Sequence, residues 1–137
     1  MIRLLKLVDD PELNSEDNLS LHLGRYLING MVSYGTDIPV VDKPKYVLFV
    51  LGNVDDICCL CRVEDHDYDA NSFKYRPLDE KFTKFVPDWY RETPHKTWFL
   101  FNSMQKIPID FLEQLLSEHP GTSVYDFIKT RANNKKL

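Results

Sequence analysis

Glycine is scarce in this 137-residue sequence, and its five copies are too dispersed to build a loop that cradles a phosphate. Neither a G-x-S-x-G nucleophile elbow nor a dinucleotide-binding fingerprint occurs. The chain also lacks a C-x-x-C pair and any pair of histidines at metal-ligand spacing. These absences disfavour catalysis, and we expect a protein without a metal ion or a cofactor.

Long apolar runs are also missing, since no segment approaches the length of a membrane span. Residues 1–8 are too short for the core of a signal peptide and precede no small-residue cleavage site. Cys58, Cys59 and Cys61 crowd into one predicted strand, where they cannot form a disulfide framework, and free thiols suit a reducing compartment. We therefore expect a cytoplasmic protein that does not enter a membrane.

An excess of positive charge is the third absence, because the formal net charge is -4. Residues 1–68 hold 6 Lys and Arg against 12 Asp and Glu, whereas residues 69–137 hold 11 against 9. A general electrostatic attraction to phosphates needs a basic face. Any contact with nucleic acid is therefore expected to be local and to lie on the later half of the chain.

The composition, with 43% hydrophobic and 28% charged residues, is that of one globular domain over residues 1–137. Residues 45–63, KYVLFVLGNVDDICCLCRV, organise the chain as a β-hairpin of two apolar strands joined by an acidic turn. In the second strand Cys59, Cys61 and Val63 share one face, and Cys58 and Arg62 share the other. Both faces are mostly apolar, so we predict that this strand is central in its sheet.

The other elements alternate without the regular order of a parallel sheet. We expect a strand over 2–8, a helix that begins at Asn14 or Ser15 and ends at Gly30, and a strand over 97–103. Shorter helices are predicted over 77–85, 108–118 and after Ser123, which forms a capping box with Asp126. Residues 64–71 read as a polar loop, and residues 133–137 are expected to fray. This pattern predicts an α+β fold with a mainly antiparallel sheet or small barrel and flanking helices.

Two metal-dependent interpretations fail on their details. Asp65, Asp67 and Asp69 imitate the start of a calcium loop, but Ala70 stands where the sharp turn needs glycine and Arg76 where a glutamate should close the site. A nuclease would need converging acidic residues and a lysine on adjacent strands, whereas the acidic pair of the hairpin lies in its turn. A hydrolytic enzyme is therefore the functional hypothesis with the weakest support.

An aromatic group beside cations is the most informative feature for function. It comprises Trp89, Tyr90, Trp98 and Phe99, joined by Arg91, His95 and Lys96. Proteins stack an unpaired base on flat rings of this kind while a cation meets its phosphate, and each stack contributes roughly 1 to 3 kcal/mol. The structural alternative is that Trp98 belongs to the core and Trp89 covers the end of the sheet.

The order of the strand and helix motifs along the chain resembles that of the PUA-like superfamily, and within it the EVE and YTH-type domains. Leu4-Leu5-Lys6-Leu7 before Asp10-Pro11 is similar to the EVE opening strand, and residues 46–50 are similar to its VLFY strand. Residues 59–64, 95–98 and 106–107 are similar to its later strands. The opening tryptophan and the Asn/Arg-rich pocket segment of the family are absent here. The resemblance implies a pseudo-barrel that binds nucleic acid, often with a modified base in an aromatic pocket.

The first functional hypothesis is therefore a non-enzymatic domain that binds single-stranded or modified nucleic acid. Its candidate site residues are Tyr34, Trp89 and Trp98 for stacking, Asn53 and Asn102 for the base edge, and Arg91 and Lys96 for phosphates. The second hypothesis is a protein-interaction or regulatory module that uses its acidic N-terminal half against a basic protein partner, with no nucleic acid.

Overall fold

The computed structural model describes residues 1–7, 13–51, 57–69, 80–87, 95–116, 121 and 123–137. Its strands are β1 (Ile2–Leu7), β2 (Val32–Thr36), β3 (Tyr46–Leu51), β4 (Ile57–Tyr68), β5 (Thr97–Pro108) and β6 (Asn134–Lys136). Its helices are α1 (Ser15–Asn29), α2 (Glu80–Thr83), α3 (Ile109–Leu116) and α4 (Val124–Lys129). No helix in this part of the chain is both long enough and apolar enough to cross a bilayer.

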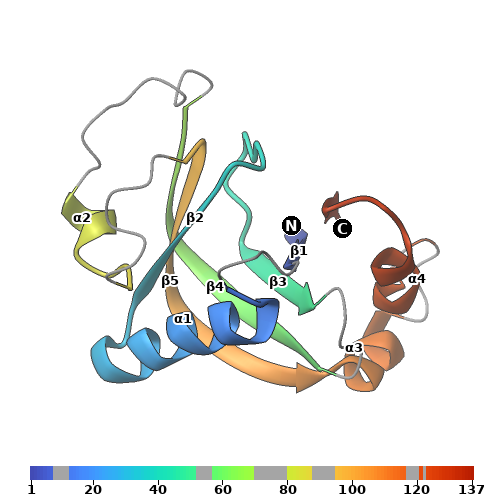
Figure 1. Ribbon diagram of the computed structural model, residues 1–137. Coiled ribbons are helices and arrows are strands. Elements are labelled where there is room, and N and C mark those ends of the chain that lie inside the picture. The colour runs from blue at the N-terminus through green and yellow to red at the C-terminus, as the bar shows by residue number, and fades with distance from the viewer. Residues whose placement is uncertain (8–12, 52–56, 70–79, 88–94, 117–120, 122) are drawn as a thin grey trace.

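The described strands form one sheet in the order β2-β5-β4-β3-β1-β6 (Figure 1). All neighbouring strands are antiparallel except β1 and β3, which run parallel. The predicted hairpin is present as β3 and β4, and β4 lies inside the sheet as its two apolar faces indicated. The α+β class with a mainly antiparallel sheet is thus confirmed. These strands do not close into a barrel, since β2 and β6 remain separate edges.

The sheet is nevertheless strongly curled, and an aromatic contact shows how far. Tyr34 on β2 and Phe49 on β3 have ring centroids 4.8 Å apart, although two strands separate β2 from β3 in the sheet. Neighbouring strands lie about 4.8 Å apart, so a flat sheet would hold these rings much further away. At one end of the curl, residues 36–39 and Asn133 with Asn134 line a shared hollow of about 280 Å³.

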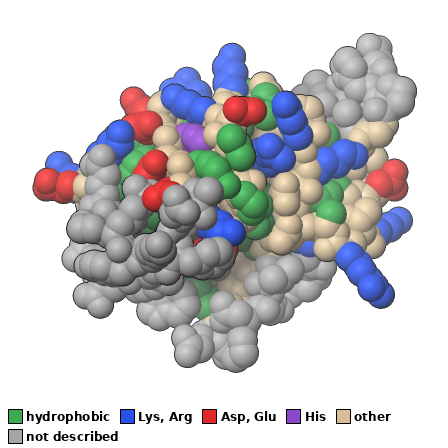
Figure 2. Space-filling view, turned by 90° about the horizontal axis from the view of Figure 1, so that it is seen from above, with side chains coloured by type: hydrophobic (Ala, Val, Ile, Leu, Met, Phe, Trp, Pro, Cys, Tyr) green, Lys and Arg blue, Asp and Glu red, His purple; other side chains and the backbone are tan. Residues whose placement is uncertain are grey.

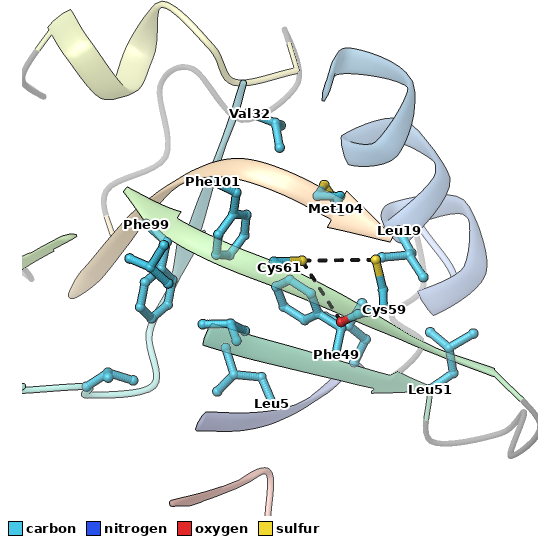
Figure 3. Packing of buried hydrophobic residues seen from close by; sticks show 14 residues of the cluster. Leu5, Leu19, Val32, Phe49, Leu51, Cys59, Cys61, Phe99, Phe101 and Met104 are labelled. Atoms are coloured by element: carbon cyan, nitrogen blue, oxygen red, sulfur yellow. Dashed lines mark hydrogen bonds between the residues drawn. The ribbon is translucent and has the colours of Figure 1, made fainter. Parts of the chain in front are cut away.

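The inner face of the curl holds the larger core, in which side chains of five strands and α1 point toward one another (Figure 3). Phe49 and Phe101 meet edge to face there, and Cys59 and Cys61 fill the space between strands. Helix α1 contributes Leu19 to this core. It begins where Asn14 accepts a hydrogen bond from the Asp17 amide at 2.8 Å and ends at Gly30, whose φ of 73° suits glycine, so both predicted caps are confirmed.

The outer face carries two separate apolar clusters. The first lies under α3 and α4 and contains Leu4, Leu48, Val50, Cys58, Ile109, Leu112, Val124 and Phe127. The second lies under α2 and contains Phe82, Val86, Trp98 and Leu100. Among the described helices, only α1 borders the stretch of sheet between these clusters, through Tyr26.

The cap of α4 differs in part from the predicted capping box. Ser123 accepts a hydrogen bond from the Asp126 amide at 3.2 Å, as expected. Glu113 of α3 also supplies a carboxylate to this cap. It accepts hydrogen bonds from the Ser123 hydroxyl at 3.3 Å and from the Tyr125 amide at 2.9 Å. A residue ten positions earlier thus completes the cap and ties α3 to α4.

Two predicted irregular segments are strands instead. Residues 64–68 continue β4, where His66 and Asp67 pair with Phe99 and Trp98 of β5, so the expected polar loop was wrong there. The C-terminal residues were expected to fray but form β6 against β1, with the Leu137 amide donating to the Ile2 carbonyl at 2.8 Å. In both places a long-range partner satisfies backbone groups that the local sequence leaves open.

Gly35 offers a test of the packing between β2 and β5. A Cβ atom built there would lie 2.4 Å from the His95 ring and 2.9 Å from the Trp98 ring. We therefore expect Gly35→Ala to lower the free energy of unfolding by about 1 to 3 kcal/mol, the usual cost of overpacking, in urea titrations.

The matched control is Gly24→Ala in α1, where the added methyl group meets nothing within 4 Å apart from its chain neighbours and the backbone of the helix itself. Alanine has the higher helix propensity, so this variant should be more stable by about 0.5 to 1 kcal/mol. Equal stability of the two variants would contradict the packing described around Gly35.

Candidate functional site

The predicted site residues do not meet in one place. Asn53, Trp89 and Arg91 lie outside the described residues. Lys96 is half-buried just before β5, where its carbonyl accepts a hydrogen bond from the Asp69 amide at 2.9 Å. Tyr34, Trp98 and Asn102 occupy three different environments.

Trp98 is wholly buried and belongs to the core under α2. Its ring lies 6.4 Å from Phe82 and meets the His95 ring edge to face at 5.2 Å, measured between centroids. Gly35 occupies the paired position on β2. Because protein covers the Trp98 ring, it has no free face for a base, and the structural alternative holds for this residue.

Tyr34 points into the curl of the sheet. Its ring packs edge to face against His22 of α1 at 5.1 Å and against Phe49 at 4.8 Å. A ring held between two others in this way stabilises the fold through apolar contact. Tyr34 is half-buried, and its position makes it a core residue at the inner face and not a platform on the surface.

Asn102 lies on the outer face of β5, in the stretch between the two apolar clusters. Its Oδ1 accepts a hydrogen bond from Arg62 Nε at 2.7 Å, and its Nδ2 donates to Glu64 Oε2 at 2.9 Å. The β4 to β5 register shifts at this point, between Arg62 and Val63 and again before Asp65. Such irregularities re-aim side chains, and here they bring the three polar groups together.

Arg62 and Asn102 border a hollow of about 400 Å³, which we call the Arg62 hollow. Its lining residues come from β3, β4, β5 and α1 and are Tyr26, Tyr46, Leu60, Arg62, Asn102, Ser103 and Gln105. Arg62 is exposed, and Tyr46 is half-buried beside it in the neighbouring strand, directly paired with it. The hollow therefore combines a cation, aromatic rings and an amide.

The geometry of Arg62 determines what the hollow can bind. Asn102 holds the guanidinium through Nε, and among the described residues no group accepts a hydrogen bond from the two terminal nitrogens. Two parallel N–H groups in this arrangement match the two oxygens of a phosphate or a carboxylate. The site is suited to an anionic group attached to a flat or apolar body that lies along Tyr46.

Sequence reasoning placed Arg62 on the correct face of its strand but did not select it as a site residue. The sequence signal that could have identified this site is an arginine on an otherwise apolar strand, on the face away from the larger core. Its register with Asn102 could not be foreseen, because the shift in pairing brings Arg62 opposite Ser103 and Val63 opposite Phe101.

The cysteines are placed for packing. Burial raises the pKa of the Cys58 thiol to about 12 and also raises the pKa of Cys61. A hydrogen bond between the Cys59 and Cys61 sulfurs, 4.0 Å apart, lowers the pKa of Cys59, but that thiol is buried in the inner core. A nucleophilic thiolate needs exposure or a nearby cation, so these thiols act as small apolar groups.

Comparison of the chain with protein-family models, curated proteins and solved structures found no match. Within the described ranges, no three His, Cys, Asp or Glu side chains are grouped so that they could hold a metal ion. Asp65, from the calcium-like segment, instead lies on β4 and forms an ion pair with Lys81 at 2.7 Å. The site is therefore assigned from its own geometry.

The buried His22 predicts a pH dependence of stability. Burial lowers its pKa from 6.5 to about 4 against the opposing effect of its hydrogen bond to the Asn18 carbonyl. The unfolded chain binds this proton more tightly, so stability is complete above pH 6.5 and falls as the pH drops toward 4. We expect a loss of roughly 3 kcal/mol by pH 4, measured by urea titration across this range.

The His22→Gln variant has no such titration and should show a flatter profile over the same pH range, whatever its stability at neutral pH. Burial also lowers the pKa of His95, so some slope should remain in this variant. An unchanged profile would show that His22 is not the buried neutral group described.

Proposed function

We propose that this protein is a non-enzymatic nucleic-acid-binding module, and that its ligand site is the Arg62 hollow. One nucleotide of a single strand lies in the hollow, with its phosphate at the Arg62 guanidinium and its base against Tyr46. The observation that carries the proposal is the orientation of Arg62, which Asn102 holds by Nε while the terminal nitrogens meet no described protein group.

The combination of groups supports a nucleotide over a simple anion. An arginine alone would suit any phosphate or carboxylate, but the hollow adds the Tyr46 ring and the exposed amide of Gln105. Rings stack on any base, and an amide can donate to and accept from a base edge. Asn102, predicted to read a base, takes a different role because its amide already binds Arg62 and Glu64.

Charge limits the strength of this binding. Lys and Arg side chains are intermingled with Asp and Glu on the face seen in Figure 2, which offers no continuous basic track. The net charge is -4. With one or two phosphates neutralised, binding is expected to be weak and only modestly salt-dependent, since the logarithmic slope scales with the number of phosphates.

The resemblance to PUA-like domains is part of the same proposal, and the curled, mainly antiparallel sheet with flanking helices supports it. Recognition of a modified base would need a pocket enclosed by several rings. Among the described residues the rings that gather together, such as Tyr34, Phe49 and Trp98, pack against protein. The described part of the chain therefore favours an ordinary nucleotide.

Substitution of Arg62 tests this proposal. We expect wild-type protein to bind a fluorescein-labelled, ten-nucleotide single-stranded DNA or RNA at low salt, measured by fluorescence polarisation. Arg62→Gln should weaken binding roughly tenfold, because a charge-assisted hydrogen bond contributes about 1.5 to 3 kcal/mol. Tyr46→Leu should weaken it by a similar factor through the lost stacking.

Lys136→Gln is the matched control, because it removes one positive charge from an exposed position on β6. It should leave the affinity within about twofold, because β1 separates β6 from β3 and solvent screens an exposed charge. Absence of binding by the wild-type protein, or equal affinity of Arg62→Gln and wild type, would overturn the proposal.

A further inference from the structure

One side of β5 carries no strand along its second half. β4 pairs with β5 as far as Pro108, whereas β2 pairs with it only from Thr97 to Phe101. Residues 102–107 therefore form an open sheet edge in the described part of the chain, seen as the lower border of the sheet in Figure 1. An open edge presents backbone donors and acceptors to any extended chain.

The hydrogen-bond pattern identifies the backbone groups that face outward. The Val63 amide donates to the Lys45 carbonyl at 3.0 Å, so Val63 and alternate residues before it direct their backbone groups toward β3. The intervening residues of β4 face β5, where their partners are Ser103, Gln105 and Ile107. Met104 and Lys106 consequently direct their N–H and C=O groups away from β4.

No described residue satisfies these outward groups. The backbone hydrogen bonds outside regular pairing include none to Met104 or Lys106, and no described side chain bonds to their amide or carbonyl groups. The edge is accessible at Gln105 and Lys106, which are exposed, whereas Met104 is buried and packs its side chain into the larger core. Ser103 and Gln105 border the Arg62 hollow, which leaves space for a side chain beside the edge.

The charge at this edge indicates the kind of partner. Lys106 is the only charged side chain in residues 102–108. It pairs with Cys59 on the side of the sheet that holds the larger core, whereas Arg62 and Glu64 lie with Asn102 on the other side. Two copies of this chain would bring like charges together if they paired edge to edge, which is unfavourable. An extended segment with acidic residues would complement the edge.

We propose that the β5 edge at Met104 and Lys106 binds an acidic, extended segment of a partner protein by strand addition. The segment forms backbone hydrogen bonds to these two residues and places a carboxylate near Lys106. This activity goes beyond the proposed nucleotide site, because its main contacts are backbone groups that a nucleotide in the hollow does not need.

The experiment uses the full chain with a ten-residue, end-capped peptide of alternating valine and glutamate. A matched peptide with lysine in place of glutamate is the charge control. We expect the acidic peptide to bind at least tenfold more tightly, measured by NMR titration. Amide hydrogen exchange should slow at Met104 and Lys106 on binding, whereas the amide of Gln105, already paired with β4, should be protected in both states.

Two substitutions of Lys106 separate the contribution of the backbone hydrogen bond to peptide binding from the contribution of the side-chain charge. Lys106→Pro removes the outward amide hydrogen without touching the ladder to β4, and should weaken binding at least tenfold. Lys106→Ala removes only the charge, and should weaken binding about threefold. Equal effects of the two variants would overturn strand addition and leave only a charge effect.

The exchange measurement on wild-type protein decides the question even if the proline variant does not fold. Unchanged exchange at Met104 and Lys106 with saturating peptide would refute the proposal, as would protection that appears without peptide through self-association. Protection by a single-stranded oligonucleotide at these two amides would assign the edge to the nucleotide proposal instead. If the protein binds no oligonucleotide but the peptide still protects these two amides, the strand-addition proposal holds and the nucleotide proposal fails.

Discussion

The contact between Tyr34 and Phe49 is the constraint on which the arrangement depends, because it joins strands that are not neighbours in the sheet. To bring these rings to 4.8 Å, the sheet must curl around its inner core and turn its other face outward. His22 extends the contact to α1, so the helix packs against the inner core. His22 is buried there although its side chain is ionisable, which indicates that the interior is closely packed.

The same curl explains where a ligand can bind. The inner face is occupied by side chains, whereas the outer face is covered by α3 and α4 over one part and by α2 over another. Between these clusters Arg62 is exposed and Asn102 is half-buried, and beside them β5 continues past the end of β2. Both proposed binding sites therefore occupy the part of the sheet that α2, α3, α4 and β2 leave open within the described ranges.

Much of the local structure could be predicted, because it depends on neighbouring residues. Alternation in residues 57–63 placed β4 correctly, and Asn14 and Gly30 marked the ends of α1. The misses have long-range causes: β6 and the second half of β4 exist because β1 and β5 pair with them. The burial of Trp98 depends on α2, and the Arg62 site depends on a register shift, neither of which periodicity can reveal. The sequence therefore predicted the platform more fully than the site.

The central claim is that the sheet curls until β2 faces β3, with the polar stretch around Arg62 outside. The most direct test is a nuclear Overhauser measurement on protein labelled at tyrosine and phenylalanine, with assignments confirmed by Tyr34→Leu and Phe49→Leu. The structure predicts cross-peaks between the Tyr34 and Phe49 rings, whose centroids are 4.8 Å apart. Absence of those cross-peaks in the folded protein would contradict the curl and with it the placement of the outer face.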